Sequence, residues 1–153
     1  MNCITIGDIN ILFMLQDLNI YAEFFALNFE FYITDLLIND IRKSNCGYII
    51  GSFDKDKKIH IRKLSIDELQ EVISLGRCVK SCCIVETSAI WLAMKLNAIV
   101  LSDSKTIAKG QEEELVCQKT EWILTELLNQ NIIKREKFEQ LATQLKAIRK
   151  KQL

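Results

Sequence analysis

Residues 85–105 read "VETSAIWLAMKLNAIVLSDSK", and this stretch decides the fold. Residues 84–96 are an apolar run of helical length that carries Glu86 in its first turn, where the helix dipole favours a carboxylate. Residues 98–103, "AIVLSD", form a short β-branched run typical of a buried strand, and Asp103 ends it. A helix that leads straight into a buried strand favours a sheet covered by helices.

The same alternation of strands and helices extends toward the N-terminus. The run "CITI" ends at Gly7 and Asp8, and the aromatic run "FEFYIT" leads into "DLLINDIRKS", which carries Asp40. The expected elements are a strand at 3–6, a buried helix at 9–27, a strand at 29–34 and a helix at 35–44. The pattern predicts an α/β fold with a mostly parallel central sheet and helices on both faces.

The remaining segments complete this prediction. Ser65 and Glu68 have the spacing of a capping box, and we expect Gly76 to end the helix that they open. The other expected elements are two short strands within 48–63, a polar helix at 105–114 and helices at 115–129 and 134–150. In the last helix one face is apolar, formed by Phe138, Leu141, Ala142, Leu145 and Ile148.

Length and composition limit the class of protein. The 153 residues suit one domain (1–153, with a core at about 3–110 and C-terminal helices at 115–150), and 49% hydrophobic residues allow a packed core. The 20 Lys and Arg residues balance the 20 Asp and Glu residues, which argues against a protein that coats nucleic acid but allows a local basic patch. No apolar run reaches the roughly 20 residues of a membrane span, and the N-terminus lacks the basic region of a signal peptide. We therefore expect a cytoplasmic protein without a membrane partner.

Six cysteines and one histidine give little support to thiol or imidazole chemistry. Cys3, Cys83 and Cys117 have apolar neighbours and are expected to be reduced core thiols. Cys78, Cys82 and Cys83 lack a C-x-x-C pair, and His60 is distant in sequence, so structural zinc is disfavoured.

Four acidic residues, each beside an apolar run, carry the chemistry that we expect. Asp8 and Asp103 follow strands, and Asp40 and Glu86 lie near helix starts, so all four are expected at the carboxyl edge of a parallel sheet. At about 5 Å separation and a dielectric constant near 20, each carboxylate pair would cost roughly 3 kcal/mol. Such a cluster is expected to hold Mg²⁺ or Mn²⁺ through its oxygen atoms.

The order of these acids resembles that of the PIN-domain family. "IGDINILFML" resembles the family's first strand and acid at Asp8, and "YITDLLINDI" resembles the second strand with an acid at Asp40. Residues 85–105 resemble its most recognisable block, with an acid, small residues, a strand and a polar acidic turn. The C-terminal helices are similar to those of small stand-alone bacterial PIN proteins.

This resemblance implies a three-layer fold and a metal-dependent endoribonuclease. The implied ligands of Mg²⁺ or Mn²⁺ are Asp8, Asp40 and Glu86, with Asp103 at a second metal or an ordered water. Single-stranded or looped RNA is the implied substrate. Many such proteins are toxins of toxin–antitoxin pairs, so an antitoxin protein and a homodimer are the implied partners.

The chain departs from the family pattern at the last turn. The family commonly has Thr-x-Asp there, whereas this chain has Ser102, Asp103 and Ser104. Asp40 and Glu86 stand where Glu and Asp respectively are commoner. A degenerate, non-catalytic PIN domain that binds RNA or protein is therefore the alternative prediction. A receiver-like domain is disfavoured, because its adjacent N-terminal acids and late buried lysine are not evident.

Each candidate residue also has a structural interpretation. Asp8, Glu86 and Asp103 would serve as helix-terminal carboxylates, and Asp40 would be a solvated helix residue. Ser102, Ser104 and Lys105 are auxiliary candidates for contacts to water or phosphate, or are simply turn and surface residues. The basic C-terminal sequence "KAIRKKQL" would either contact RNA or remain solvated.

Overall fold

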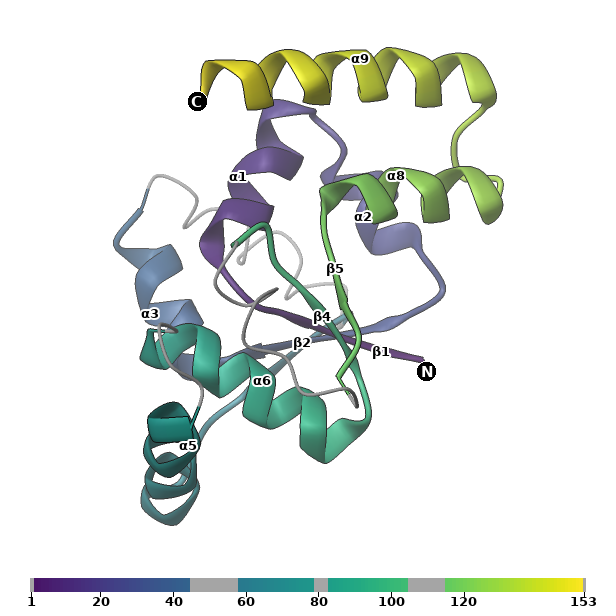
Figure 1. Cartoon of the computed structure of the whole chain (residues 1–153). Coiled ribbons are helices and arrows are strands. Elements are labelled where there is room, and N and C mark those ends of the chain that lie inside the picture. Colours follow the sequence, from purple (N-terminus) through teal and green to yellow (C-terminus); the bar gives the residue numbers. More distant parts are fainter. Residues whose placement is uncertain (1, 45–57, 79–82, 105–114, 153) are drawn as a thin grey trace.

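The computed structural model describes residues 2–44, 58–78, 83–104 and 115–152. Its centre is a five-stranded sheet with the order β3-β2-β1-β4-β5, in which every strand pairs in parallel with its neighbour (Figure 1). The strands are β1 (Cys3–Ile6), β2 (Glu30–Thr34), β3 (Ile59–Arg62), β4 (Ile99–Leu101) and β5 (Cys117–Gln118). The predicted three-layer α/β class is confirmed, because helices lie on both faces of this sheet.

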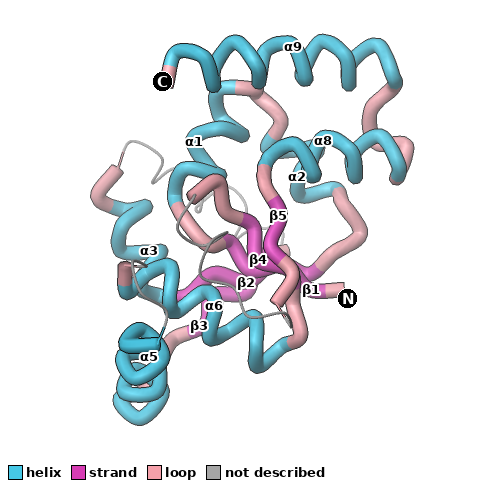
Figure 2. Tube along the Cα trace, in the orientation of Figure 1, coloured by secondary structure: helices cyan, strands magenta, loops and turns pink. Residues whose placement is uncertain are grey.

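The helices form two layers of different thickness. Helices α1, α2 and α8 cover one face with α9 outside them, whereas α6 covers the other face and α5 packs on α6 (Figure 2). The described helices are α1 (Ile9–Asp17), α2 (Tyr21–Ala26), α3 (Asp35–Arg42), α5 (Ile66–Cys78), α6 (Ile84–Leu96), α8 (Thr120–Asn129) and α9 (Arg135–Lys151).

Side chains alternate across the sheet as the strand geometry requires. In β1, Ile4 and Ile6 enter the main core under α1 and α8, whereas Thr5 points to the other face and donates to the carbonyl of Ala89 in α6 at 3.4 Å. Phe31 and Ile33 of β2 follow the same alternation. The apolar runs that predicted buried strands are therefore buried on both faces.

The parallel register brings three strand ends together at one edge. Ile6 of β1 lies opposite Leu101 of β4, and Thr5 lies opposite Tyr32 of β2. Asp8 and Asp103 follow β1 and β4 by two residues, so they emerge at the same edge. This is the edge at which open α/β sheets bind their ligands.

Three predicted elements differ in the structure. The single helix expected at 9–27 is two helices, because Asn19 adopts a left-handed backbone with φ of 54° and ends the first. Residues 117–118 form β5 rather than part of a helix. Gly76 does not end α5, which continues to Cys78, and a Cβ at Gly76 would meet Thr87 of α6 at an ordinary 3.6 Å.

Other predictions are confirmed at the level of single contacts. Ser65 accepts from the N–H of Glu68 at 3.1 Å, and Glu68 accepts from the N–H of Ser65 at 3.0 Å, as in a capping box. Leu141 and Leu145 of the predicted apolar face of α9 are buried. Cys83 is exposed, so its assignment to the core was wrong, whereas Cys3 and Cys117 are half-buried.

Some expectations fall on other parts of the chain. The strand expected near 48–53 and the helix expected at 105–114 lie outside the described residues. Across the described ranges, no helix combines the length and the apolar composition that crossing a membrane requires.

Candidate acidic site at the sheet edge

Asp8 is the most buried of the four predicted acids. Only 6% of its surface is exposed, and its Oδ1 accepts from the N–H of Ile11 at 3.1 Å as the N-cap of α1. Burial raises the pKa of Asp8 above its ordinary value and nearby Asp103 adds to the rise, although hydrogen bonds from Ser102 and Ile11 oppose it. Asp8 therefore caps α1, as the structural interpretation predicted, and its pKa is also raised.

Ser102 connects the end of β4 to Asp8. Its hydroxyl donates to Oδ2 of Asp8, and it accepts from the backbone N–H of Ser104 at 3.0 Å. Because the hydroxyl hydrogen is used on Asp8, the Ser102–Ser104 turn fixes the orientation of the buried carboxylate. The two serines named as auxiliary residues thus lie at the acidic site.

Both carboxylate oxygens of Asp103 contact the start of α8. Its Oδ1 accepts from the N–H of Thr120 at 3.1 Å, and its Oδ2 accepts from the hydroxyl of Thr120 at 2.7 Å. Its side chain is only 8% exposed. Asp103 therefore satisfies the first turn of α8, a role that the helix dipole favours.

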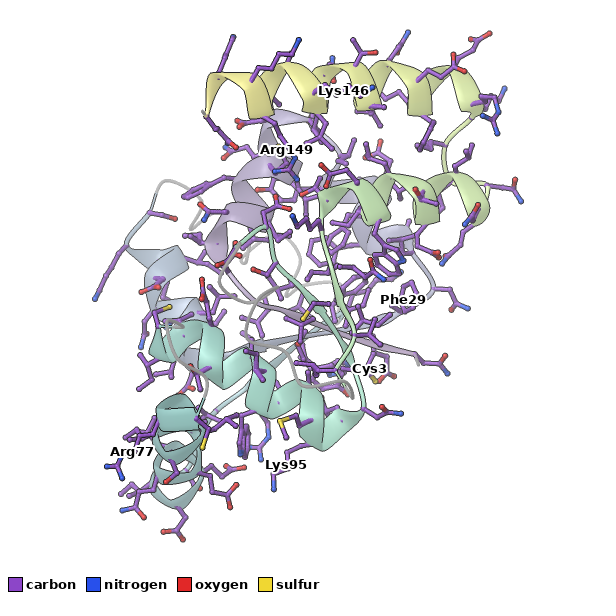
Figure 3. All side chains as sticks on the ribbon, in the orientation of Figure 1. Cys3, Phe29, Arg77, Lys95, Lys146 and Arg149 are labelled. Carbon is purple, nitrogen blue, oxygen red and sulfur yellow. The ribbon has the colours of Figure 1, made fainter. Side chains whose placement is uncertain are left out.

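Arg149 of α9 completes the surroundings of Asp103. Its Nη2 lies 3.0 Å from Oδ1 of Asp103 and 2.9 Å from Glu121, and its Nε donates to Glu121 at 2.6 Å. Figure 3 shows Arg149 pointing from α9 toward the start of α8. The hydrogen bonds that Arg149 donates, first to Glu121 and then to Asp103, raise the pKa of Arg149, so it remains a cation.

Asp40 and Glu86 lie on two different helices, α3 and α6. Glu86 is half-buried in the first turn of α6, as predicted, and α6 begins at the carboxyl edge of the sheet. Asp40 is exposed and lies five residues into α3, about 7–8 Å along the helix from its start. A hydrogen bond of 2.8 Å between the hydroxyls of Thr34 and Ser88 holds the start of α3 beside α6.

The available ligand atoms are oxygens, which is the atom type that a hard divalent cation prefers. Asp8, Ser102 and Asp103 offer carboxylate and hydroxyl oxygens, and Mg²⁺ in proteins often takes only one or two carboxylates with several waters. Within the described ranges, no group of three or more His, Cys, Asp or Glu side chains is close enough to hold a metal ion. Of the four predicted acids, Asp103 lies near enough to Asp8 to raise its pKa, but the structure does not gather three of them into one group. Lys105 lies outside the described residues.

A cleft of about 920 Å³ opens beside Asp103 between α1, α8 and α9. Phe13, Leu124 and Phe138 are among its apolar lining residues, and Lys146 and Lys150 lie on its α9 wall. Its charged lining residues balance, with Asp17, Asp103 and Glu121 against Lys146, Arg149 and Lys150. Among the described lining residues the cations belong to α9, so that wall is suited to contact phosphate groups.

The sequence interpretation missed three residues that surround Asp103. They are Thr120, Glu121 and Arg149, and they lie 17 or more residues from Asp103 in the chain. One available signal was the pair Thr120–Glu121 just before an apolar run. Such a pair is typical of the first turn of a helix, whose free N–H groups can donate to a carboxylate. The basic sequence "KAIRKKQL" includes Arg149, but no local pattern indicated that Arg149 contacts Asp103.

Comparison of the chain with protein-family models finds no match, and comparison with curated proteins finds no relative.

Proposed function

We propose that this protein is a metal-dependent endoribonuclease of PIN-like type that hydrolyses RNA phosphodiester bonds. The observation that carries the proposal is Asp8, a buried carboxylate with a raised pKa at the end of the central strand β1, close to Asp103. Catalytic groups are expected at the carboxyl edge of a parallel sheet, and a buried acid with a shifted pKa at that edge is a candidate for one.

Asp8, Asp40 and Glu86 are the proposed holders of Mg²⁺ or Mn²⁺, with Asp103 at the margin of the site. A divalent ion there would lower the pKa of a bound water and offset charge on the scissile phosphate. Ser102 holds the Asp8 carboxylate in one orientation, and Thr120 holds Asp103. These contacts fix the orientation of the two carboxylates.

Single-stranded or looped RNA is the proposed substrate. The cleft beside Asp103 offers room for a strand, and Lys146 and Lys150 on α9 are the expected phosphate contacts. Replacing both with glutamine should weaken RNA binding in EDTA and flatten its salt dependence. The double variant Lys134→Gln, Lys137→Gln at the other end of α9 is the matched control, and equal losses in both would contradict this placement.

The deciding experiment is thermal unfolding with EDTA, Mg²⁺ or Mn²⁺, followed by an RNA cleavage assay. Binding to the native state alone raises Tm by linkage, and Glu86→Gln should remove much of this rise. Glu136→Gln is the control, because Glu136 also lies in the first turn of a helix. Cleavage products with 5′-phosphate and 3′-hydroxyl ends, absent in Glu86→Gln, would support hydrolysis.

A non-catalytic PIN-like module is the second candidate. It is favoured by the hydrogen bonds that already occupy all four carboxylate oxygens of Asp8 and Asp103. If millimolar Mn²⁺ leaves Tm unchanged while RNA or a protein partner still binds in EDTA, this candidate replaces the nuclease.

The biological setting that we propose is that of a toxin in a toxin–antitoxin pair, acting in the cytoplasm as a homodimer. Growth arrest on expression, relieved by a protein encoded beside it, would support the toxin role. Light scattering of the purified chain would give its oligomeric state.

A further inference from the structure

Two aromatic rings remain partly open in the cleft between α1, α8 and α9. Phe13 lines the cleft from α1 and Phe138 lines it from α9, and both residues are half-buried. The phenylalanines of the core differ, because they are buried and their rings pack against one another (Phe24, Phe25 and Phe31). Phe13 and Phe138 therefore give an aromatic lining to a cleft whose volume, about 920 Å³, is that of a ligand site.

Among the described residues, the two lysines that line the cleft form no ion pair. Lys146 and Lys150 are both exposed, and they lie one helical turn apart on the same face of α9. Two of the three carboxylates that line the cleft, in contrast, are paired with Arg149 (Asp103 and Glu121). The positive charge of the two lysines is therefore available to an anionic ligand.

The whole of α9 is basic in a chain that is neutral overall. Arg135–Lys151 contains six Lys and Arg residues against two Glu residues, so α9 carries a net charge of +4 and the rest of the chain carries −4. This helix lies outside α1 and α8, at the surface of the molecule (Figure 1). Such a separation of charge steers a polyanion toward α9.

Single-stranded RNA combines the two features that this cleft complements, which are apolar base faces and a repeated negative charge. Proteins that bind single strands stack successive bases on aromatic rings and hold the backbone with cations. We propose that Phe13 and Phe138 stack unpaired bases of the RNA while Lys146 and Lys150 contact its phosphates. This inference rests on the proposed function and assigns the residues that select unpaired RNA, because paired bases stay stacked on one another and cannot reach the rings.

The test is fluorescence titration of the full chain, in EDTA, with a short oligouridylate that carries one 2-aminopurine. Stacking on an aromatic ring quenches 2-aminopurine, so binding to the wild type should lower its fluorescence. Phe138→Leu keeps an apolar side chain but removes the ring, so it should bind about tenfold more weakly and with little quenching. Phe13→Leu should act in the same direction. Phe29→Leu is the matched control and should equal the wild type, because Phe29 is half-buried outside the cleft, with its ring 5.8 Å from that of Trp122.

The quenching in the wild type is a readout that needs no variant to fold. Binding without quenching would overturn the stacking while leaving RNA as the substrate. So would equal losses of affinity in Phe138→Leu and Phe29→Leu, or equal binding of a hairpin that pairs the same strand. Tighter binding of oligoglutamate than of the RNA would overturn it in favour of an acidic protein partner. Quenching in a chain that shows no Mn²⁺-dependent cleavage would support the stacking and contradict the nuclease.

Discussion

The hydroxyl of Ser102 donates to Oδ2 of Asp8 across 94 positions of sequence, and the backbone N–H of Ser104 donates to that same hydroxyl at 3.0 Å. This chain of two hydrogen bonds joins the ends of β4 and β1. It gives the buried Asp8 carboxylate a donor that burial would otherwise deny it.

Ser102→Ala should lower the free energy of unfolding by about 1–3 kcal/mol at pH 7, because it leaves a buried carboxylate oxygen without its donor. The loss should shrink as the pH falls through the raised folded pKa of Asp8, because the carboxylate is then protonated. A series of urea unfolding experiments from pH 7 downward measures it. Ser74→Ala on the exposed side of α5 is the control and should change little; an equal loss in both variants would contradict the role of Ser102.

Asp8 should make stability depend on pH in a predictable direction. Its folded pKa lies above the ordinary value of 3.8, so the folded chain binds the proton more tightly than the unfolded chain does. Stability from this group is therefore fully present below about pH 3.8 and is lost as the pH rises through the folded pKa.

Asp8→Asn should remove that loss, so its unfolding free energy at pH 7 should equal or exceed the wild-type value. Asparagine keeps the N-cap of α1, because its side-chain oxygen also accepts from the N–H of Ile11. Urea unfolding between pH 3 and 7 measures the difference, with Asp17→Asn at the end of α1 as control. Strong destabilisation of Asp8→Asn at every pH would mean that the ionised carboxylate is structural.

Thr120→Val should destabilise the chain by about 1–2 kcal/mol, because Asp103 then loses the hydroxyl donor at 2.7 Å while both groups stay buried. Thr125→Val is the matched control, since Thr125 is exposed and its hydroxyl donates to the carbonyl of Glu121 in the same helix. Thermal unfolding compares the two, and a loss no greater than that of the control would show that Thr120 does not hold Asp103.

The sheet and the position of Asp8 were predictable because they follow from local patterns. Short apolar runs alternating with helical ones indicate parallel strands, and a carboxylate just after such a run must emerge at the sheet edge. The break at Asn19 was less visible, because its direct neighbours Leu18 and Ile20 are apolar and the tolerance of asparagine for a left-handed backbone is the main sign of it. The two-residue strand β5 is too short to show a period.

The surroundings of Asp103 were not predictable from sequence. Arg149 meets Asp103 only because α8 and α9 pack as a hairpin and α9 is rotated to present that residue. The rotation depends on the burial of Leu141 and Leu145, which the periodicity of α9 did predict, but the distance to Asp103 depends on the whole fold. A pairing across 46 positions carries no local signal.

Gly7 and Gly76 provide a paired test of how tightly the site edge is packed. A Cβ at Gly7 would lie 2.8 Å from the carbonyl oxygen of Leu101 and 3.0 Å from a side-chain carbon of Val100, so β1 and β4 would have to separate just before Asp8. Gly7→Ala should therefore destabilise the chain by about 1–3 kcal/mol. It should also weaken metal-dependent stabilisation, because Ser102 follows Leu101 and would move away from Asp8.

Gly76→Ala should change the free energy of unfolding in the opposite direction. Gly76 lies inside α5, where a Cβ meets Thr87 only at 3.6 Å, so alanine should gain about 0.5–1 kcal/mol from its better helix propensity. Urea unfolding of the two variants under the same conditions decides the matter. If Gly7→Ala proves as well tolerated as Gly76→Ala, the close approach of β1 and β4 that aligns Asp8 with Ser102 does not occur in solution.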